Sequence, residues 1–481
     1  MRKTEGAKEV GVNLPKNSYP DPIKIPIFGD CTPKNPAVIL RREIIVIEMK
    51  KFLLVLTAVM SLIIRVQAQD DDTTYHKIRV GGYGEMMASW QNYGLNRWGS
   101  TKGSTEVNHA AISIPRFVLA MDYKFNEKWI LGAEIEFEAG GTGMALEIEK
   151  GTGSENGEYE TELEKGGEVA LEQFHLTRKI VDAFNIKVGH IIVPVGLTNT
   201  HHEPINFYTT FRPEGATTLL PCTWHETGVE FFGRIGNVLH YQAQIVAGQN
   251  PLGFSRYNWI KGGKQGFFEA DNFTRPAYVL RLDFNGVKGL RLGTSMYYCH
   301  DAGQNCDRLI TFNSYDPVNV KIFSFDAQYK NRFVTFRGNY LCGKLTEAQI
   351  VDRVLRTYSS GSGYSRALNV ADKALTYNFE IGCNLKNIFN LSGNFPTIHP
   401  FAHYEYYNPQ EKVKNGADDR CQVNYWAFGI NYFALPNLVI KADYTCRKIG
   451  TDQMFKNTKS NFNNENEFCI TVAYVAWFCQ K

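Results

Sequence analysis

The feature that most constrains this chain is a residue-by-residue alternation of polar and apolar side chains, which recurs in short segments along most of its length. In the segment 321–330, Phe323 and Phe325 share one face, whereas Ser324 and Asp326 share the other. Successive side chains of a β-strand point to opposite faces, so this alternation predicts strands. We expect sixteen strands, at residues 78–90, 112–123, 129–138, 169–180, 186–193, 226–234, 239–248, 277–284, 290–300, 321–330, 332–341, 375–385, 398–407, 423–433, 438–446 and 468–478.

The connections between the predicted strands alternate in length. Short turns follow the even-numbered strands, among them an Asn285-Gly286 hairpin signal, and long polar loops follow the odd-numbered ones. Bacterial outer-membrane barrels show this asymmetry, with short periplasmic turns and longer extracellular loops. A soluble β-sandwich has no reason to keep it, and a propeller would show a blade repeat. The sequence therefore predicts an all-β fold, a closed sixteen-stranded antiparallel transmembrane β-barrel.

The polar face of the predicted strands carries long charged side chains of both signs. In a wide barrel they would line a water-filled lumen, where rings of one sign select ions of the other sign. Mixed signs therefore predict weak selectivity, and the alternative is a hydrated wall with no role in selection. The predicted pore-lining charges are Arg116, Glu134, Glu136, Arg281, Asp283, Arg291, Asp326, Arg337, Glu380, Glu405, Lys441 and Asp443.

A secretory pattern begins at Met49, with Lys50 and Lys51 ahead of an apolar stretch and a small residue, Ala68, at its end. This is the arrangement of a signal peptide. We therefore expect mature protein to start at Gln69; the alternative is a real cytoplasmic extension before a signal anchor. The predicted organisation is a mis-called upstream extension at 1–48, a signal peptide at 49–68 and a barrel domain at 69–481.

Composition excludes several other classes. Outside the signal-like stretch, no apolar run approaches the roughly 18 residues of a spanning helix, and a net charge of +3 gives no support for nucleic-acid binding. The ten cysteines show no CxxC pattern. Cys299 and Cys306 flank a loop that a disulfide could close; the alternative is that the cysteines are small apolar fillers. The spacing of residues 345–358 predicts a short helix.

The segment 194–225, about thirty residues long, joins the fifth and sixth predicted strands. Loops of this length are usually functional or disordered, and the prolines and aromatic residues here argue against disorder. In a wide barrel, a loop that folds inward narrows the lumen. The alternative is a rigid loop that only packs on the wall. The residues predicted to shape the field of such a constriction are His201, His202, Glu203, Arg212, Glu214 and His225.

The histidines and carboxylates of this loop also raise the question of zinc. Adjacent histidines in an extended segment rarely bind one ion, and the sequence has no HExxH motif. We therefore predict no metal site, no cofactor and no catalytic residue, so the protein is not expected to be an enzyme. The Glu- and Gly-rich loop 140–167 is expected to be solvated and extracellular, where bridging divalent ions can link it to lipopolysaccharide.

The run IKVGHIIVPVGLTNTHHEPINFYTTFRPEGATTLLPCTWHETGVEFFG, from Ile186 to Gly233, and the later GFSRYNWIKGGKQG resemble the Bacteroidetes porins of the phosphate-selective porin O and P family. The resemblance covers most of the predicted barrel. It implies a sixteen-stranded outer-membrane barrel, usually a homotrimer in lipid and lipopolysaccharide, through which small solutes or anions such as phosphate diffuse. The mixed inward charges favour a general or weakly selective pore. The alternative is a surface binding protein or adhesin on a plugged barrel.

Overall fold

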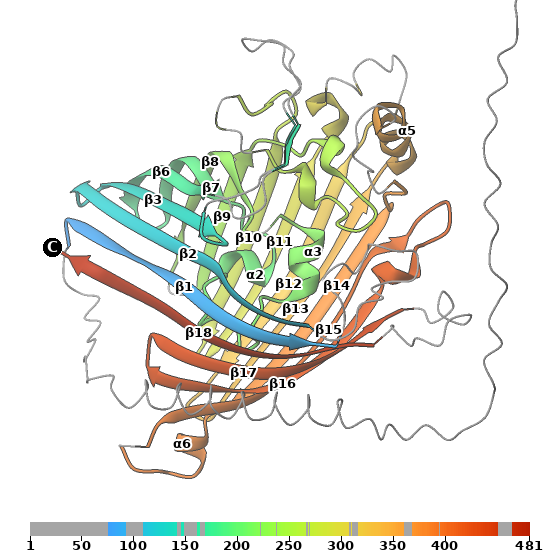
Figure 1. The fold of residues 1–481 in the computed structure, drawn as a ribbon. Helices are drawn as coiled ribbons and strands as arrows, with labels where there is room; N and C mark the ends of the chain where they lie inside the picture. Colours follow the sequence, from blue (N-terminus) through green and yellow to red (C-terminus); the bar gives the residue numbers. More distant parts are fainter. Residues whose placement is uncertain are drawn as a thin grey trace, which may run out of the picture. The chain divides into compact units, whose positions relative to one another are not determined.

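The computed structural model describes residues 76–92, 109–141, 146–148, 161–163, 169–221, 223–236, 238–265, 268, 270–306, 309, 316–359, 368–393, 395–450 and 464–481. All of them belong to one compact unit, Tyr75–Lys481. The upstream extension and signal peptide predicted for residues 1–68 lie outside the described residues. Sixteen antiparallel strands form a closed barrel, in which the last strand pairs with the first (Figure 1).

The strands follow the wall in sequence order, as predicted, and every predicted strand is present with its ends shifted by a few residues. In order they are β1 (Ile78–Gln91), β2 (His109–Asn126), β3 (Trp129–Glu138), β6 (Val169–Val181), β7 (Phe184–Ile192), β8 (His225–Ile235), β9 (Leu239–Val246), β10 (Ala277–Val287), β11 (Leu290–Cys299), β12 (Val320–Lys330), β13 (Val334–Leu345), β14 (Lys373–Cys383), β15 (Thr397–Lys412), β16 (Val423–Leu435), β17 (Leu438–Ile449) and β18 (Asn464–Gln480).

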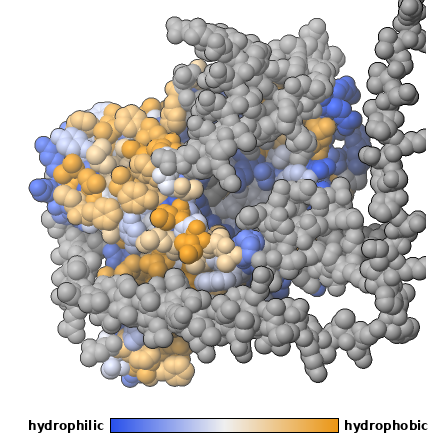
Figure 2. Space-filling model, in the orientation of Figure 1, coloured by the Kyte–Doolittle hydropathy of each residue, from blue (hydrophilic) through white to orange (hydrophobic). Residues whose placement is uncertain are grey.

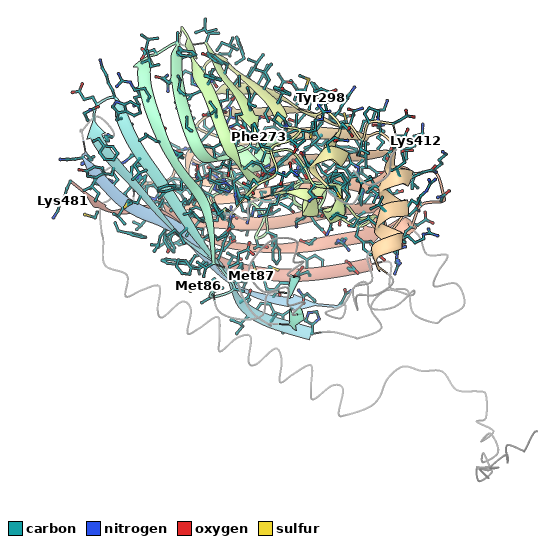
Figure 3. All side chains as sticks on the ribbon, turned by 90° about the horizontal axis from the view of Figure 1, so that it is seen from above. Met86, Met87, Phe273, Tyr298, Lys412 and Lys481 are labelled. Carbon is teal, nitrogen blue, oxygen red and sulfur yellow. The ribbon has the colours of Figure 1, made fainter. Side chains whose placement is uncertain are left out.

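The barrel has apolar side chains outside and polar side chains inside. In β12, Phe323 and Phe325 are each 47% exposed on the outer face, whereas Asp326 is fully buried on the inner face. The neighbours Met86 and Met87, labelled in Figure 3, differ in the same way, with exposures of 52% and 6%. Figure 2 shows apolar side chains over the outside of the wall formed by the first strands. This polarity is the reverse of that in a soluble β-protein.

The long connections carry the helices, except α6 (Leu385–Ile388), which lies in a turn at the opposite end. α2 (Gly196–Thr200) and α3 (Glu214–Leu219) follow β7. The other elements of the long connections are η1 (Pro251–Gly253), η2 (Lys261–Gly263), η3 (Ala302–Asn305), η4 (Asp419–Cys421), α5 (Ala348–Ser359), which confirms the predicted helix, and a hairpin of β4 (Leu146–Ile148) and β5 (Thr161–Leu163), which was not predicted. Among the described residues, none of these helices has the length and hydrophobicity needed to cross a bilayer.

The described cysteines form no disulfide. Cys299 and Cys306, the pair that flanks a loop, are both buried, and no disulfide joins them. Burial raises the pKa of the Cys421 thiol, in the loop before β16, to about 12. These side chains therefore behave as small apolar fillers, the second of the two predicted alternatives.

Candidate functional site

Residues 193–221, 223 and 224 form a segment that folds into the barrel between β7 and β8, and we call it the in-folded segment. Figure 1 shows its helices α2 and α3 surrounded by strands. Its last part is anchored in an apolar cluster, in which Leu219, Leu220 and Trp224 are buried with side chains of the wall. The rings of Trp224 and Tyr297 of β11 lie 4.7 Å apart. The predicted inward fold is thus what the structure has, and apolar packing fixes one end of it.

Carboxylates of β14, β15 and β17, the part of the barrel we call the β14–β17 wall, bind the main chain of the in-folded segment. Glu405 accepts hydrogen bonds from the backbone N–H groups of Glu214 (2.9 Å) and Gly215 (2.7 Å). Asp443 accepts from the N–H of Thr210 at 2.6 Å. The N–H of Tyr208 donates to Glu380 in the same way at 2.9 Å. Hydrogen bonds to ionised acceptors are the strong ones, so these charges fix the segment.

Lys441, also on this wall, is a hydrogen-bond donor to the main chain of the in-folded segment. Its ammonium group donates to the carbonyl oxygens of Phe207 (2.8 Å) and Thr209 (2.9 Å). The side chain is fully buried. A buried ammonium is tolerated only where acceptors surround it, so Lys441 is bound to the segment and does not face open solvent.

Arg281 is the centre of a second group of charges, on β10 to β12. Its guanidinium binds both carboxylate oxygens of Asp326 at 3.0 Å and those of Asp283 at 2.8 and 3.0 Å. Arg291 also binds Asp283, at 3.0 Å, and hydrogen-bonds to His201 of the segment. Burial and Arg291 together lower the pKa of His201 to about 3, so its ring is neutral near pH 7. The pore-lining charges predicted here are therefore paired with one another.

Glycine allows the in-folded segment to approach the β14–β17 wall closely. A Cβ atom on Gly215 would lie 2.2 Å from the hydroxyl of Thr376 and 2.7 Å from Cβ of Tyr407. On the wall, a Cβ atom on Gly382 would lie 2.3 Å from the ring of Tyr208. These positions require glycine for packing and not for a special backbone angle.

Beyond β18, the strands β1, β2, β3 and β6 form what we call the β1–β6 wall. Arg116 donates to Glu85 at 2.8 Å and to the carbonyl oxygen of His202 at 2.9 Å. Glu134, Glu136 and Glu172 are buried beside it. Sequence alternation predicted the first two of these glutamates but missed Glu172. Glu134, Glu172 and His202 are the group of described residues that could hold a metal ion, since their ligand atoms lie within 4.8 Å of one another.

The remaining residues predicted for the constriction each have a hydrogen-bond or ion-pair partner, and all of them except His225 lie in the in-folded segment. Glu203 accepts from Asn206 at 2.6 Å, and Arg212 donates to Thr223 at 2.9 Å. Glu214 accepts from Arg447 of β17 at 3.0 and 3.1 Å. The last one, His225, is the first residue of β8 and hydrogen-bonds to His190. Arg337, predicted to line the pore, binds Glu380 at 2.5 Å.

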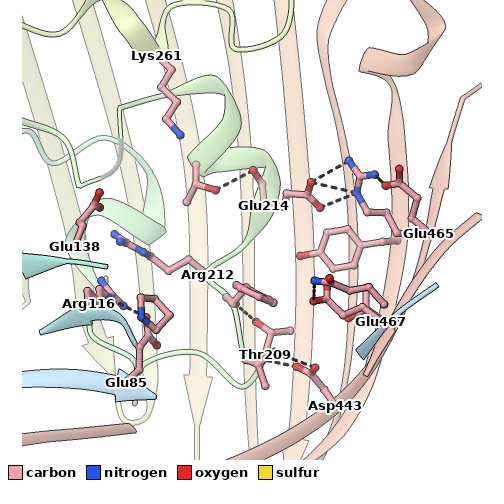
Figure 4. A pocket seen from close by; sticks show the side chains of 18 residues that line it. Glu85, Arg116, Glu138, Thr209, Arg212, Glu214, Lys261, Asp443, Glu465 and Glu467 are labelled. Atoms are coloured by element: carbon pink, nitrogen blue, oxygen red, sulfur yellow. Dashed lines mark hydrogen bonds and ion pairs between the residues drawn. The ribbon is translucent and has the colours of Figure 1, made fainter. Parts of the chain in front are cut away.

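Two large cavities remain, and of these the first is lined in part by residues of the in-folded segment. The first, of about 450 Å³, lies among strand ends that lead to the long loops, and Figure 4 shows Arg212 reaching across it toward the side of Glu138 and Arg116. The second, of about 670 Å³, lies among residues of the short turns and carries charges of both signs. Charged residues lining the first cavity are Glu85, Arg116, Glu138, Arg212, Glu214, Lys261, Asp443, Arg447, Glu465 and Glu467; those lining the second are Lys128, Lys179, Asp182, Lys187, Glu230, Arg234 and Asp283.

Comparison with known protein sequences finds similarity to a bacterial protein but no matching family model. No family model matches the sequence. The chain is 26% identical over 377 residues to an uncharacterised protein of Aquifex aeolicus (strain VF5), which covers 76% of this chain and 75% of that protein.

Among solved structures, the chain is similar to outer-membrane channels and porins. The outer membrane channel DcaP of Acinetobacter baumannii is 11% identical, with a TM-score of 0.48, covering 83% of this chain and 97% of that one. An anion-selective porin from Comamonas acidovorans is 7% identical, with a TM-score of 0.47, covering 84% and 100%. OmpF of Salmonella typhi, in complex with daunomycin, is 11% identical, with a TM-score of 0.49, covering 83% and 98%.

Proposed function

We propose that this protein is a porin of a bacterial outer membrane, through which small hydrophilic solutes diffuse passively. The observation that carries the proposal is the polarity of the closed barrel, with large apolar side chains outside and charged ones inside. A closed barrel satisfies its own backbone hydrogen bonds, which is the condition for a β-structure to span lipid. Its outer face then matches the hydrocarbon and its inner face matches water.

In this proposal the in-folded segment is the constriction, and the two cavities, one near the long loops and one near the short turns, are the approaches. The charges along the path have both signs and many are paired, as Arg281 is with Asp326 and Arg447 with Glu214. The fields of close opposite charges largely cancel at the distance of a passing ion. We therefore propose a general pore with weak ion selectivity.

Several finer assignments extend this proposal. The resemblance of Ile186–Gly233 to the phosphate-selective porin O and P family supports membership of that family, a homotrimer and anions such as phosphate among the solutes. The secretory pattern of residues 49–68 supports export by a signal peptide. Lipopolysaccharide would contact the extracellular loops. Chemical cross-linking in detergent and N-terminal sequencing of exported protein test the trimer and the start at Gln69.

Planar-bilayer recordings test the pore. Protein purified from the outer membrane of an expressing Gram-negative host should give stable conductance steps and only a modest reversal potential in a salt gradient. A strongly anion-selective potential would contradict weak selectivity. Deleting Thr198–Leu219 should raise the conductance, because the deletion removes most of the in-folded segment. An unchanged conductance in the deletion variant would show that this segment is not the constriction.

A second candidate function is a binding protein or adhesin on a plugged barrel. The burial of Arg281, Lys441 and Asp326 favours it, because residues lining an open channel would contact water. The same recordings separate the two functions. Folded protein that gives no steps until Thr198–Leu219 is deleted would favour the plugged barrel, and steps from the unaltered protein would favour the porin.

A further inference from the structure

We propose that Glu134, Glu172 and His202 form a binding site for a divalent transition-metal ion such as Zn²⁺, which ties the in-folded segment to the β1–β6 wall. The ligands come from three places in the chain: β3, β6 and the segment itself. Their ligand atoms lie within 4.8 Å of one another, and all three residues are buried. Zinc–ligand bonds of about 2.0–2.2 Å span roughly 3–4 Å between two ligands, so small side-chain rotations would close the site.

Glu172 is turned into this group by an irregularity of the sheet. Glu134 of β3 pairs with Gln173, but the next residue, Ile135, pairs with Leu171, so Glu172 is an extra residue opposite the partner strand. Such a β-bulge re-aims a side chain. By strict alternation Glu172 would lie with Phe174, which is 50% exposed on the outer face, yet Glu172 is 1% exposed.

The carboxylate of Glu172 is poorly matched by the protein around it. Among the described residues, neither of its oxygen atoms accepts a hydrogen bond of normal distance and angle, although both are buried beside Glu136 and Thr223. One oxygen of Glu136, two residues beyond Glu134, is in the same condition. Two cations lie nearby, and both have other partners: Arg116 binds Glu85 and the main chain of His202, and Arg212 donates to Thr223. A buried, unpaired carboxylate is costly, and a cation placed among these oxygens would remove that cost.

His202 is oriented as a metal ligand. Its Nδ1 lies 3.2 Å from the carbonyl oxygen of Asn199, which can only accept, so Nδ1 carries the hydrogen. In the neutral ring the lone pair is then on Nε2, which lies 3.9 Å from a carboxylate oxygen of Glu134. Metal-binding histidines usually donate their second ring nitrogen to such a carbonyl. The other oxygen of Glu134 accepts from Gln173, which fixes that ligand as well.

The ligand set indicates the kind of ion. Ca²⁺ and Mg²⁺ prefer oxygen ligands alone, whereas an imidazole with carboxylates suits Zn²⁺ and its first-row neighbours. Three protein ligands leave at least one position for water. The proposal departs from the expectation that this loop holds no metal. It does not use the adjacent histidines as a pair, because His201 faces Arg291 and His202 faces the glutamates.

Zinc binding to the whole exported protein tests the site, and conduction is not needed for the test. After chelator treatment, isothermal titration calorimetry of the folded barrel in detergent should show one Zn²⁺ per chain. His202→Ala and Glu172→Gln should each weaken binding by at least about 100-fold, since even outer-shell changes cost roughly 10–100-fold. His201→Ala is the matched control and should bind as the unaltered protein does.

Heat-modifiable gel migration shows whether each variant is folded, and Glu172→Gln keeps the shape of the side chain. Absence of stoichiometric Zn²⁺ binding would overturn the site, as would unchanged affinity in both ligand variants. An infrared band of a protonated carboxylic acid that persists with excess Zn²⁺ and disappears in Glu172→Gln would also overturn it. That result would mean that a proton, and not a metal ion, neutralises Glu172.

Discussion

The two walls that face the in-folded segment each carry a buried glutamate, and the two glutamates differ in their hydrogen bonding. On the β14–β17 wall, Glu405 meets two backbone N–H groups of the segment. On the β1–β6 wall, Glu172 is equally buried, but among the described residues its oxygens accept no hydrogen bond of normal distance and angle. A buried carboxylate contributes stability only where donors meet it. The comparison teaches that protein donors match the glutamate of the first wall, whereas the glutamate of the second wall is left for another partner.

Of the substitutions on the β14–β17 wall, removal of the Lys441 side chain should lower the free energy of unfolding most. Lys441→Ala leaves the carbonyl oxygens of Phe207 and Thr209 without their donor and leaves Asp443 without a neighbouring cation. We expect a loss of about 3–5 kcal/mol in the free energy of unfolding, because two hydrogen bonds from a buried charged donor are lost, at roughly 1.5–3 kcal/mol each. Guanidinium unfolding of the barrel in detergent measures it. Lys330→Ala, at an exposed site on β12, is the control and should change little; equal stability of the two variants would contradict the role of Lys441.

Matched substitutions on the two walls should sharpen the contrast. Glu405→Gln weakens hydrogen bonds from two N–H groups to a charged acceptor and should cost about 1.5–3 kcal/mol of unfolding free energy. Glu172→Gln in metal-free protein removes an unpaired buried charge and should leave stability unchanged or raise it. With excess Zn²⁺, the unaltered protein should gain stability and Glu172→Gln should not. Equal losses in both metal-free variants would mean that the walls do not differ.

A smaller effect is expected from a single methyl group at the contact with the β14–β17 wall. Gly215→Ala forces Cβ against Thr376 and Tyr407 and should cost about 1–3 kcal/mol of unfolding free energy through overpacking. Gly393→Ala is the matched control, because nothing lies within 4 Å of its added Cβ atom. Thermal unfolding followed by gel migration compares the two. If Gly215→Ala is as stable as Gly393→Ala, the close approach of the segment is not required.

Much of the fold could be predicted from the sequence because alternation and connection length are local signals. All sixteen strands are where the pattern puts them, and the apolar face, with Phe323 and Phe325, is outside. The hairpin of β4 and β5 was missed because Glu and Gly dominate its loop and give no strand pattern. Several predicted pore-lining charges instead hydrogen-bond to the main chain of the in-folded segment. The sequence could not predict this, since it depends on which backbone groups the segment brings to each wall.

Glu172 shows where alternation fails. The rule assumes that each residue has one partner across the sheet, and one extra residue at the bulge reverses the direction of a side chain. The sequence does not mark the bulge itself. Alternation does place Glu172 on the same face as Ala170 and Phe174, and a charged side chain on a face that meets lipid is unfavourable. That charge was the one indication in the sequence that alternation fails at Glu172.

Where the in-folded segment is attached through its main chain, its position does not depend on which exposed side chains it carries. Glu405, Asp443 and Lys441 bind N–H and carbonyl groups that every residue except proline offers in full. Exposed side chains such as Phe211 can then be exchanged without loosening the attachment. In nanopore engineering, this makes the segment a fixed frame with an interchangeable sensing surface, where a chosen side chain or chemical label could be presented to passing molecules.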